Sequence, residues 1–84
     1  MTHTAHDLQA EFPADAALLH ELKLSDAHYQ KLAGRHHDIN REIHRIESES
    51  EAASDTRLEE LKKARLSLLD EVAALLVRVR AATA

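Results

Sequence analysis

Histidine is the residue type in this 84-residue chain that most invites a chemical role, because seven are present. Imidazole nitrogens bind transition metals and exchange protons near neutral pH. His36 and His37 are neighbours, so on a helix their side chains point about 100° apart. His37 and His44 share a helix face, but seven residues of rise separate them by about 10.5 Å, too far for one ion. We therefore expect no metal site within one chain, and only a site shared across a dimer axis stays open.

The sequence also lacks the common catalytic motifs. It contains neither HExxH nor the Glu-x-x-His pattern of di-iron bundles. Without cysteine it has no thiol nucleophile, disulfide or Cys zinc site, and one glycine is too few for a phosphate-binding loop. No serine lies in a nucleophile motif, and the carboxylates fall on helix faces that we expect to be solvated. We expect no catalytic residue, no cofactor and no enzymatic activity.

The elements that would position these side chains are helices, since one glycine and one proline cannot supply the turns of an all-β fold. The first predicted helix covers residues 13–23, because Pro13 suits a first helical position where its missing N–H has no partner. We expect residues 1–12 to form a mobile tail, in which Leu8 and Phe12 can close one turn. The single helical domain then covers residues 13–84.

The second predicted helix covers about residues 25–49. Ser25 is its expected N-cap, with Leu24 and Tyr29 at the two hydrophobic-staple positions. Its core positions recur at spacings of three and four, as in a coiled-coil heptad. They are Tyr29, Leu32, His36, Ile39, Ile43 and Ile46.

The third predicted helix covers about residues 55–81 and follows a turn. The small, polar segment SESEAAS, residues 48–54, predicts this turn, and Ser54 or Asp55 is the expected N-cap. The helix repeats the heptad spacing. Its core positions are Leu58, Leu61, Arg65, Leu68, Val72, Leu75 and Val79.

The two heptads fit each other as an antiparallel hairpin, because one register pairs all six layers. In that register Ile39 meets Arg65 and His36 meets Leu68. Two polar residues thus occupy adjacent core layers, which fixes the register at some cost in stability. The expected fold is all-α, a coiled-coil-like two-helix hairpin preceded by a short helix.

His36 and Arg65 are the predicted polar core positions, and each has two interpretations. His36 is either a neutral core histidine with one hydrogen bond or a pH-sensitive group whose charged form is penalised by burial. In the second case, acidification below about pH 6 loosens the bundle. Arg65 either packs its stem on Ile39 and reaches Asp38 or Glu42, or forms an anion site, which nearby carboxylates disfavour.

A second apolar stripe lies beside the first on the third helix. A two-helix hairpin cannot bury both stripes, so the first helix covers part and a second copy of the chain covers the rest. We expect a homodimeric four-helix bundle. The stripe consists of Leu66, Leu69, Ala73 and Leu76.

Three stretches resemble the YdcH-like family of small bacterial proteins. They are LKLSDAHYQKLA, residues 22–33, INREIHRIE, residues 39–47, and LKKARLSLLDEV, residues 61–72. The resemblance implies a helical hairpin, usually cytoplasmic, with no assigned activity and no established catalytic residue. Leu69 and Gly34 depart from the usual pattern, where lysine and a better helix former are common.

Charge and hydropathy limit which cell compartment and which binding partners we expect for this protein. The net charge is −4, and acids and bases interleave as on solvated helices. The N-terminus has no signal peptide pattern and no apolar run could span a bilayer, so we expect a cytoplasmic protein. The expected function is a non-enzymatic interaction module, a homodimer with an unidentified protein partner. The alternative is a small nucleic-acid-associated regulator that binds through Lys and Arg side chains of the second and third helices. These residues are Arg35, Arg41, Arg45, Lys62, Lys63, Arg65, Arg78 and Arg80.

Overall fold

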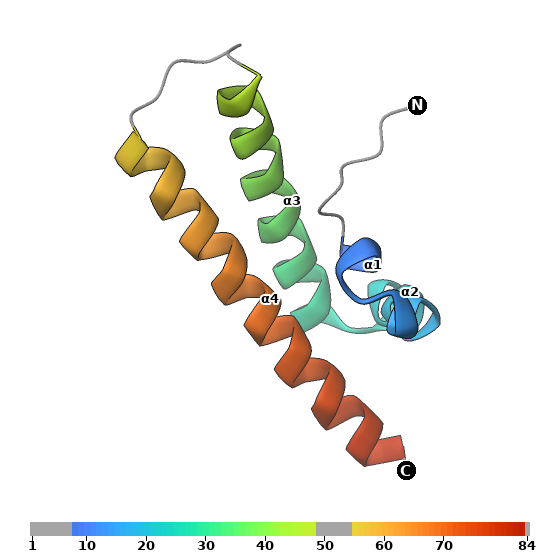
Figure 1. The fold of residues 1–84 in the computed structure, drawn as a ribbon. Helices are drawn as coiled ribbons and strands as arrows, with labels where there is room; N and C mark the ends of the chain where they lie inside the picture. The colour runs from blue at the N-terminus through green and yellow to red at the C-terminus, as the bar shows by residue number, and fades with distance from the viewer. Residues whose placement is uncertain (1–7, 49–54, 84) are drawn as a thin grey trace.

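The computed structural model describes residues 8–48 and 55–83, and every regular element in these ranges is helical (Figure 1). The predicted all-α hairpin with a short N-terminal helix is confirmed. The predicted turn after Ser48 and the N-terminal histidines His3 and His6 lie outside the described residues. In chain order the elements are α1 (Leu8–Glu11), the 3-10 turn η1 (Pro13–Asp15), α2 (Ala16–Ser25), α3 (Ala27–Glu47) and α4 (Asp55–Thr83).

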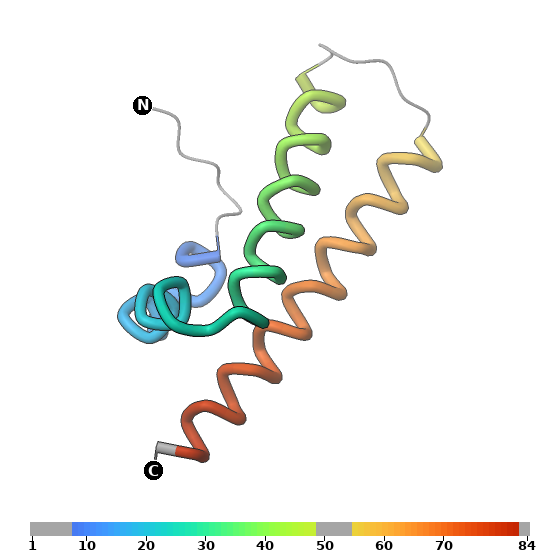
Figure 2. Tube along the Cα trace, turned by 180° about the vertical axis from the view of Figure 1, so that it is seen from behind, coloured from blue at the N-terminus to red at the C-terminus, as the bar shows by residue number. Residues whose placement is uncertain are grey.

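The hairpin consists of α3 and α4, which run antiparallel. With 29 residues α4 is about 44 Å long, close to the longest dimension of the molecule, 47 Å. Because α3 has only 21 residues, the C-terminal end of α4 continues past the start of α3 (Figures 1 and 2). This overhang leaves part of α4 without cover from α3.

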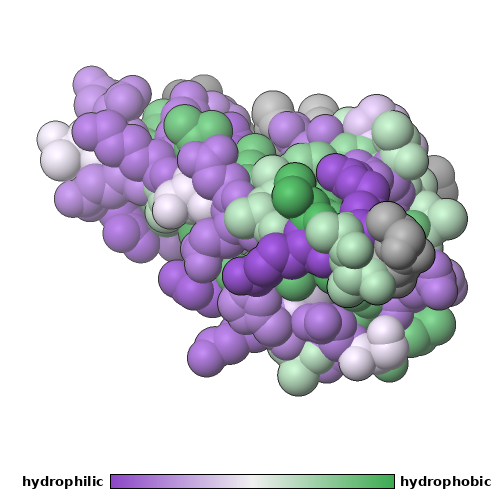
Figure 3. All heavy atoms as spheres, turned by 90° about the horizontal axis from the view of Figure 1, so that it is seen from below, coloured by the Kyte–Doolittle hydropathy of each residue, from purple (hydrophilic) through white to green (hydrophobic). Residues whose placement is uncertain are grey.

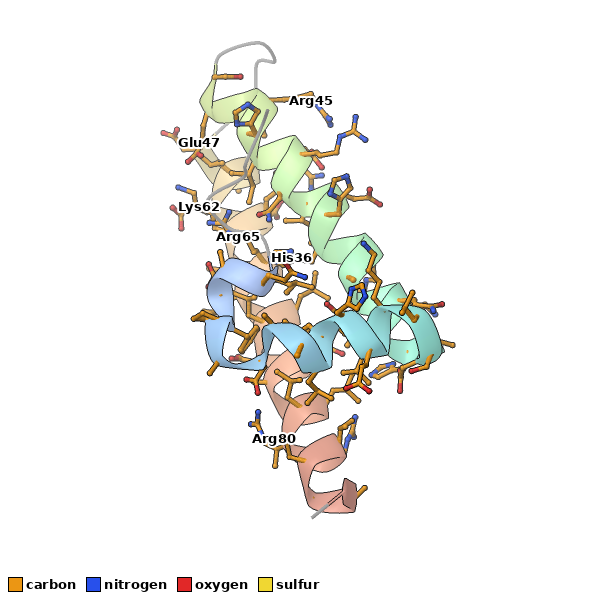
Figure 4. The ribbon with its side chains drawn as sticks, turned by 90° about the vertical axis from the view of Figure 1, so that its right-hand side faces the viewer. His36, Arg45, Glu47, Lys62, Arg65 and Arg80 are labelled. Carbon is orange, nitrogen blue, oxygen red and sulfur yellow. The ribbon has the colours of Figure 1, made fainter. Side chains whose placement is uncertain are left out.

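The N-terminal helices lie beside the start of α3, near that overhang (Figure 1), and α2 crosses α4 in the view of Figure 4. Their buried residues Leu8, Leu19 and Leu22 belong to one apolar cluster with residues of both hairpin helices, which we call the proximal core. Seen from below, apolar atoms gather at this end of the molecule, whereas the far end of the hairpin is mainly hydrophilic (Figure 3). The hairpin members of the proximal core are Tyr29, Leu32, Leu68, Val72, Leu75 and Leu76.

The N-terminal boundary differs from the prediction. Helical structure is described from Leu8, whose side chain is 5% exposed in the proximal core. The Phe12 N–H donates to the Leu8 carbonyl over 3.0 Å, which closes the turn expected there. Pro13 begins a separate 3-10 turn rather than the α-helix itself. Residues 8–12 therefore pack onto the hairpin because Leu8 buries its side chain.

The cap of α3 also differs from the prediction. Asp26, not Ser25, is the N-cap, with extended backbone and a carboxylate that accepts from the Tyr29 N–H at 2.8 Å. Ser25 is the last residue of α2, and its hydroxyl donates to the Glu21 carbonyl. With the cap moved by one residue the expected staple does not form, and Leu24 is 71% exposed.

Candidate functional site

A buried polar layer crosses the middle of the hairpin. His36 is 2% exposed and Asn40 is 7% exposed, and both lie one turn apart on α3. From α4 the half-buried Arg65 donates its Nη1–H to Asn40 Oδ1 over 3.0 Å. Asn40 Nδ2 lies 3.5 Å from His36 Nδ1. Figure 4 shows the His36 and Arg65 side chains at the same height of the hairpin.

The donors and acceptors of this layer determine the proton position on His36. A guanidinium only donates, so the contact with Arg65 requires the oxygen of the Asn40 amide on that side. The Asn40 nitrogen, which only donates, then faces His36 Nδ1. Nδ1 must accept, which places the imidazole proton on Nε2 and leaves the ring neutral. The geometry therefore favours a neutral imidazole in which Nδ1 accepts, and protonation of Nδ1 would remove that acceptor.

Arg65 does not reach the carboxylates that we expected for it. Its partner is the Asn40 amide, and Glu42 instead accepts from Arg57 Nε and Nη2 at 3.1 and 2.8 Å. Asn40 was not predicted as a core residue, because it lies beside the heptad positions rather than on one. Its position one turn after His36, facing a core arginine, is the signal that could have identified it.

Ion pairs fix the hairpin on both sides of the polar layer. Arg57 with Glu42, and Lys62 with Glu47 at 3.2 Å, join α4 to α3 at the far end. Arg80 pairs with Asp15 and so joins α4 to η1, in the N-terminal unit formed by α1, η1 and α2. Three of the basic residues on α4 thus form ion pairs with other helices of the fold.

The second apolar stripe on α4 divides into a covered and an uncovered part. Leu76 is 1% exposed in the proximal core, and Leu69 packs against it. Leu66 is 61% exposed, and Ala73 is half-buried. Val77, 59% exposed, lies on the same face as Leu66 because eleven residues are close to three turns. We call Leu66, Ala73 and Val77 the α4 apolar face.

The outward face of α3 is basic. Lys31, Arg35, Arg41 and Arg45 are exposed along it, with Asp38 as the exposed acid between them. In Figure 4 Arg45 points away from α4. We call these four bases the α3 basic face.

The remaining histidines do not gather into a site. His20, His28, His37 and His44 are exposed. Within residues 8–48 and 55–83, no three His, Cys, Asp or Glu side chains lie together as metal ligands would. In the same ranges no helix combines the length and hydropathy that crossing a membrane requires.

Comparison with known proteins gives a family and no function. A search of the curated proteins and a search of the solved structures found no match. The model of one family, described as a protein of unknown function (DUF465), matches residues 30–76, which include most of α3 and the first three quarters of α4. The matched span contains the whole polar layer and the α3 basic face, and the expected YdcH-like resemblance is consistent with it. The chain belongs to the DUF465 family of proteins of unknown function.

Proposed function

We propose that this protein is a non-enzymatic helical interaction module that forms a homodimer through the α4 apolar face. The observation that carries the proposal is the exposure of Leu66 and Val77, at 61% and 59%, on one face of a helix whose other apolar residues are largely covered. Scattered exposed leucines need no explanation, but apolar residues aligned on one helix face favour a partner helix. The cytoplasm of a bacterial cell is the proposed location, on the family resemblance.

A two-fold arrangement uses this face economically. If two α4 helices pack antiparallel about an axis between Asp70 and Ala73, Leu66 meets the partner subunit's Val77 and Val77 meets the partner subunit's Leu66. The small Ala73 side chain lets the two backbones approach at the centre. Burying the exposed part of each Leu66 or Val77 side chain stabilises the dimer by about 1–2 kcal/mol. Association of two chains itself costs several kcal/mol. We therefore expect a weak, concentration-dependent dimer.

Light scattering on a sizing column tests the dimer with a matched control. The wild-type chain should approach twice its 9.4 kDa mass as the concentration rises. Leu66→Glu or Val77→Glu should keep the mass at one chain, because two buried carboxylates would face apolar side chains. Leu24→Glu makes the same change at a residue 71% exposed on α2 and should still dimerise. A wild type that stays monomeric at all concentrations, or a Leu24 variant that is equally monomeric, would overturn the proposal.

Nucleic acid binding has less support as an alternative. Arg65 contacts Asn40, and Lys62 and Arg80 pair with carboxylates. These three bases have intramolecular partners, so α4 offers a weaker basic stripe than its composition suggests. The bases that remain together are those of α3, and they point to a different partner.

A further inference from the structure

Three of the four bases on the α3 basic face take no part in the ion pairs of the described residues. Lys31, Arg35 and Arg41 form no ion pair with any residue in the described ranges. By contrast, Arg57 and Lys62 on α4 each pair with a carboxylate of α3. Solvated helices usually interleave opposite charges four residues apart, because such pairs stabilise the helix.

The spacing of these bases destabilises α3. Lys31 and Arg35 are four residues apart, and so are Arg41 and Arg45, so each pair places like charges one above the other on the helix surface. Asp38 is the exposed acid between the two pairs. Asp38 lies three residues from both Arg35 and Arg41, which offsets part of this repulsion.

Gly34 adds a second, independent cost at the same place. It lies inside α3 between Lys31 and Asp38, where glycine is among the worst helix formers. A Cβ added to it would meet nothing within 4 Å, so no neighbour in the fold requires the missing side chain. Glycine does allow another backbone to approach a helix closely. Two unfavourable choices on one exposed face are explained together if something binds there.

We propose that the α3 basic face docks an acidic α-helix of a different protein, which lies along α3 and over Gly34. From Lys31 to Arg45 the face is about 21 Å long, the length of about four helical turns. The matching helix carries a pair of carboxylates at each end of this span and a basic or neutral residue opposite Asp38. Electrostatic complementarity of this kind fixes the register and the orientation of a partner.

Two other occupants fit the face less well. A second copy packed two-fold on this face would set its own bases against those of the first, so this face does not form a two-fold dimer. A phosphate backbone would meet Asp38 in the middle of the site and a chain of net charge −4 around it. The buried Tyr29 is not available on this face to stack a base. The inference rests on the proposed function only in that both assign binding rather than catalysis, and it uses α3 instead of α4.

A titration of the full-length, nitrogen-15-labelled chain tests the docking. The probe is a synthetic alanine-based helical peptide of about four turns with a glutamate pair, four residues apart, near each end. We expect amide shifts confined to α3, lost at high salt and absent with a peptide that has glutamine in place of glutamate. Arg41→Glu with Arg45→Glu should weaken binding about tenfold or more. Lys23→Glu with Arg78→Glu, the same charge change at exposed residues of α2 and α4, should weaken it less than about twofold.

Substitution of Gly34 distinguishes docking of a helix on α3 from general charge attraction. Gly34→Gln should raise the melting temperature, because glutamine is a better helix former in open space. The same variant should weaken peptide binding about tenfold, because its side chain fills the approach path. Unchanged peptide binding by Gly34→Gln, equal weakening by the control pair, no α3 shifts at low salt, or tighter binding of duplex RNA than of the peptide would each overturn the inference. The oligomeric state of the wild type is measured separately, so either proposal can fail alone.

Discussion

The two ends of the hairpin are built on different physical principles. At the proximal end α2 lies across α3 and α4, and nine buried residues form one apolar cluster. Beyond the polar layer, two of the described residues of the far end are buried outside that cluster, Ile43 and Leu61. Ion pairs between partly exposed side chains join the helices there. We call this the distal end.

This difference teaches that local stability along one helix pair depends on the third element packed against it. In a pair of helices each helix buries one apolar face. A third helix that crosses the pair lets each of them bury further apolar side chains. The distal end has few buried apolar side chains, so it should open at lower free energy than the proximal end. The polar layer of His36, Asn40 and Arg65 is the boundary between the two ends.

The largest expected effect compares the same substitution at both ends. Leu32, 1% exposed, lies in the proximal core, and Leu61, 5% exposed, lies at the distal end. We expect Leu32→Ala to lower the free energy of unfolding by about 3–5 kcal/mol, since its cavity is enclosed by several elements. Leu61→Ala should cost about 2 kcal/mol, because two helices joined by surface contacts can close the gap. Urea denaturation of both variants measures the difference, and equal losses would contradict the division of the hairpin.

The next effect concerns the boundary itself. Asn40→Ala removes the acceptor of Arg65 and the donor that faces His36. A buried polar group left without its partner costs about 1–3 kcal/mol. We expect a loss in that range at pH 7, measured by urea denaturation. A loss no larger than that of an exposed alanine substitution would show that the layer contributes no stability.

A change of pH should act on the same layer. Protonation of His36 at Nδ1 would place a second donor against Asn40 Nδ2 and a cation near Arg65. The unfolded chain therefore binds the proton more readily, and stability is fully present above about pH 6.5 and lost below it. Between pH 7 and 5 the free energy of unfolding should fall. Thermal melts should show this loss in the wild type and not in His36→Leu.

The Asn40→Asp variant is a control in which acidification should change the stability in the opposite direction. A carboxylate at position 40 accepts from Arg65 and also from a protonated His36, so the charged ring gains a partner. The loss of stability on acidification should shrink or reverse in this variant. If wild type, His36→Leu and Asn40→Asp share one pH dependence, the polar layer does not sense protons.

Much of this arrangement could be predicted from the sequence, for identifiable reasons. Heptad spacing predicts the two hairpin helices and their register because apolar periodicity directly reflects which face is buried. The burial of Leu8 could not be predicted, since its spacing from Phe12 indicates one turn but not the surface onto which that turn packs. Ser25 and Asp26 are both good caps, and only the backbone geometry of Asp26 decides between them.

The candidate surfaces were only partly predictable. The spacing of Leu66, Leu69, Ala73 and Leu76 predicts a second stripe but not which of its residues α2 would cover. Leu69 and Leu76 pack into the proximal core, and Leu66 does not. Charge counting likewise shows bases on both long helices. Only their side-chain partners separate the paired bases of α4 from the exposed bases of α3.

The smallest expected effect compares an ion pair at each end. Arg57 contacts Glu42 at the distal end, where the two side chains are 49% and 27% exposed. Arg80 pairs with Asp15 at the proximal end, where they are 51% and 20% exposed. Exposed pairs contribute about 0.2–1 kcal/mol, and we expect Arg80→Ala to lie nearer the upper limit because Asp15 is the more buried acid.

Local opening should separate these two pairs more clearly than global stability does. Arg57→Ala should speed hydrogen exchange at the C-terminal amides of α3 and leave the amides of the proximal end unchanged, because the distal end opens alone. Arg80→Ala should speed exchange in α2, since it releases the N-terminal unit from α4. Both effects should weaken in about 1 M salt, because salt screens ion pairs between exposed side chains. If Arg57→Ala changed exchange equally at both ends, the hairpin would open as one unit and the polar layer would not divide it.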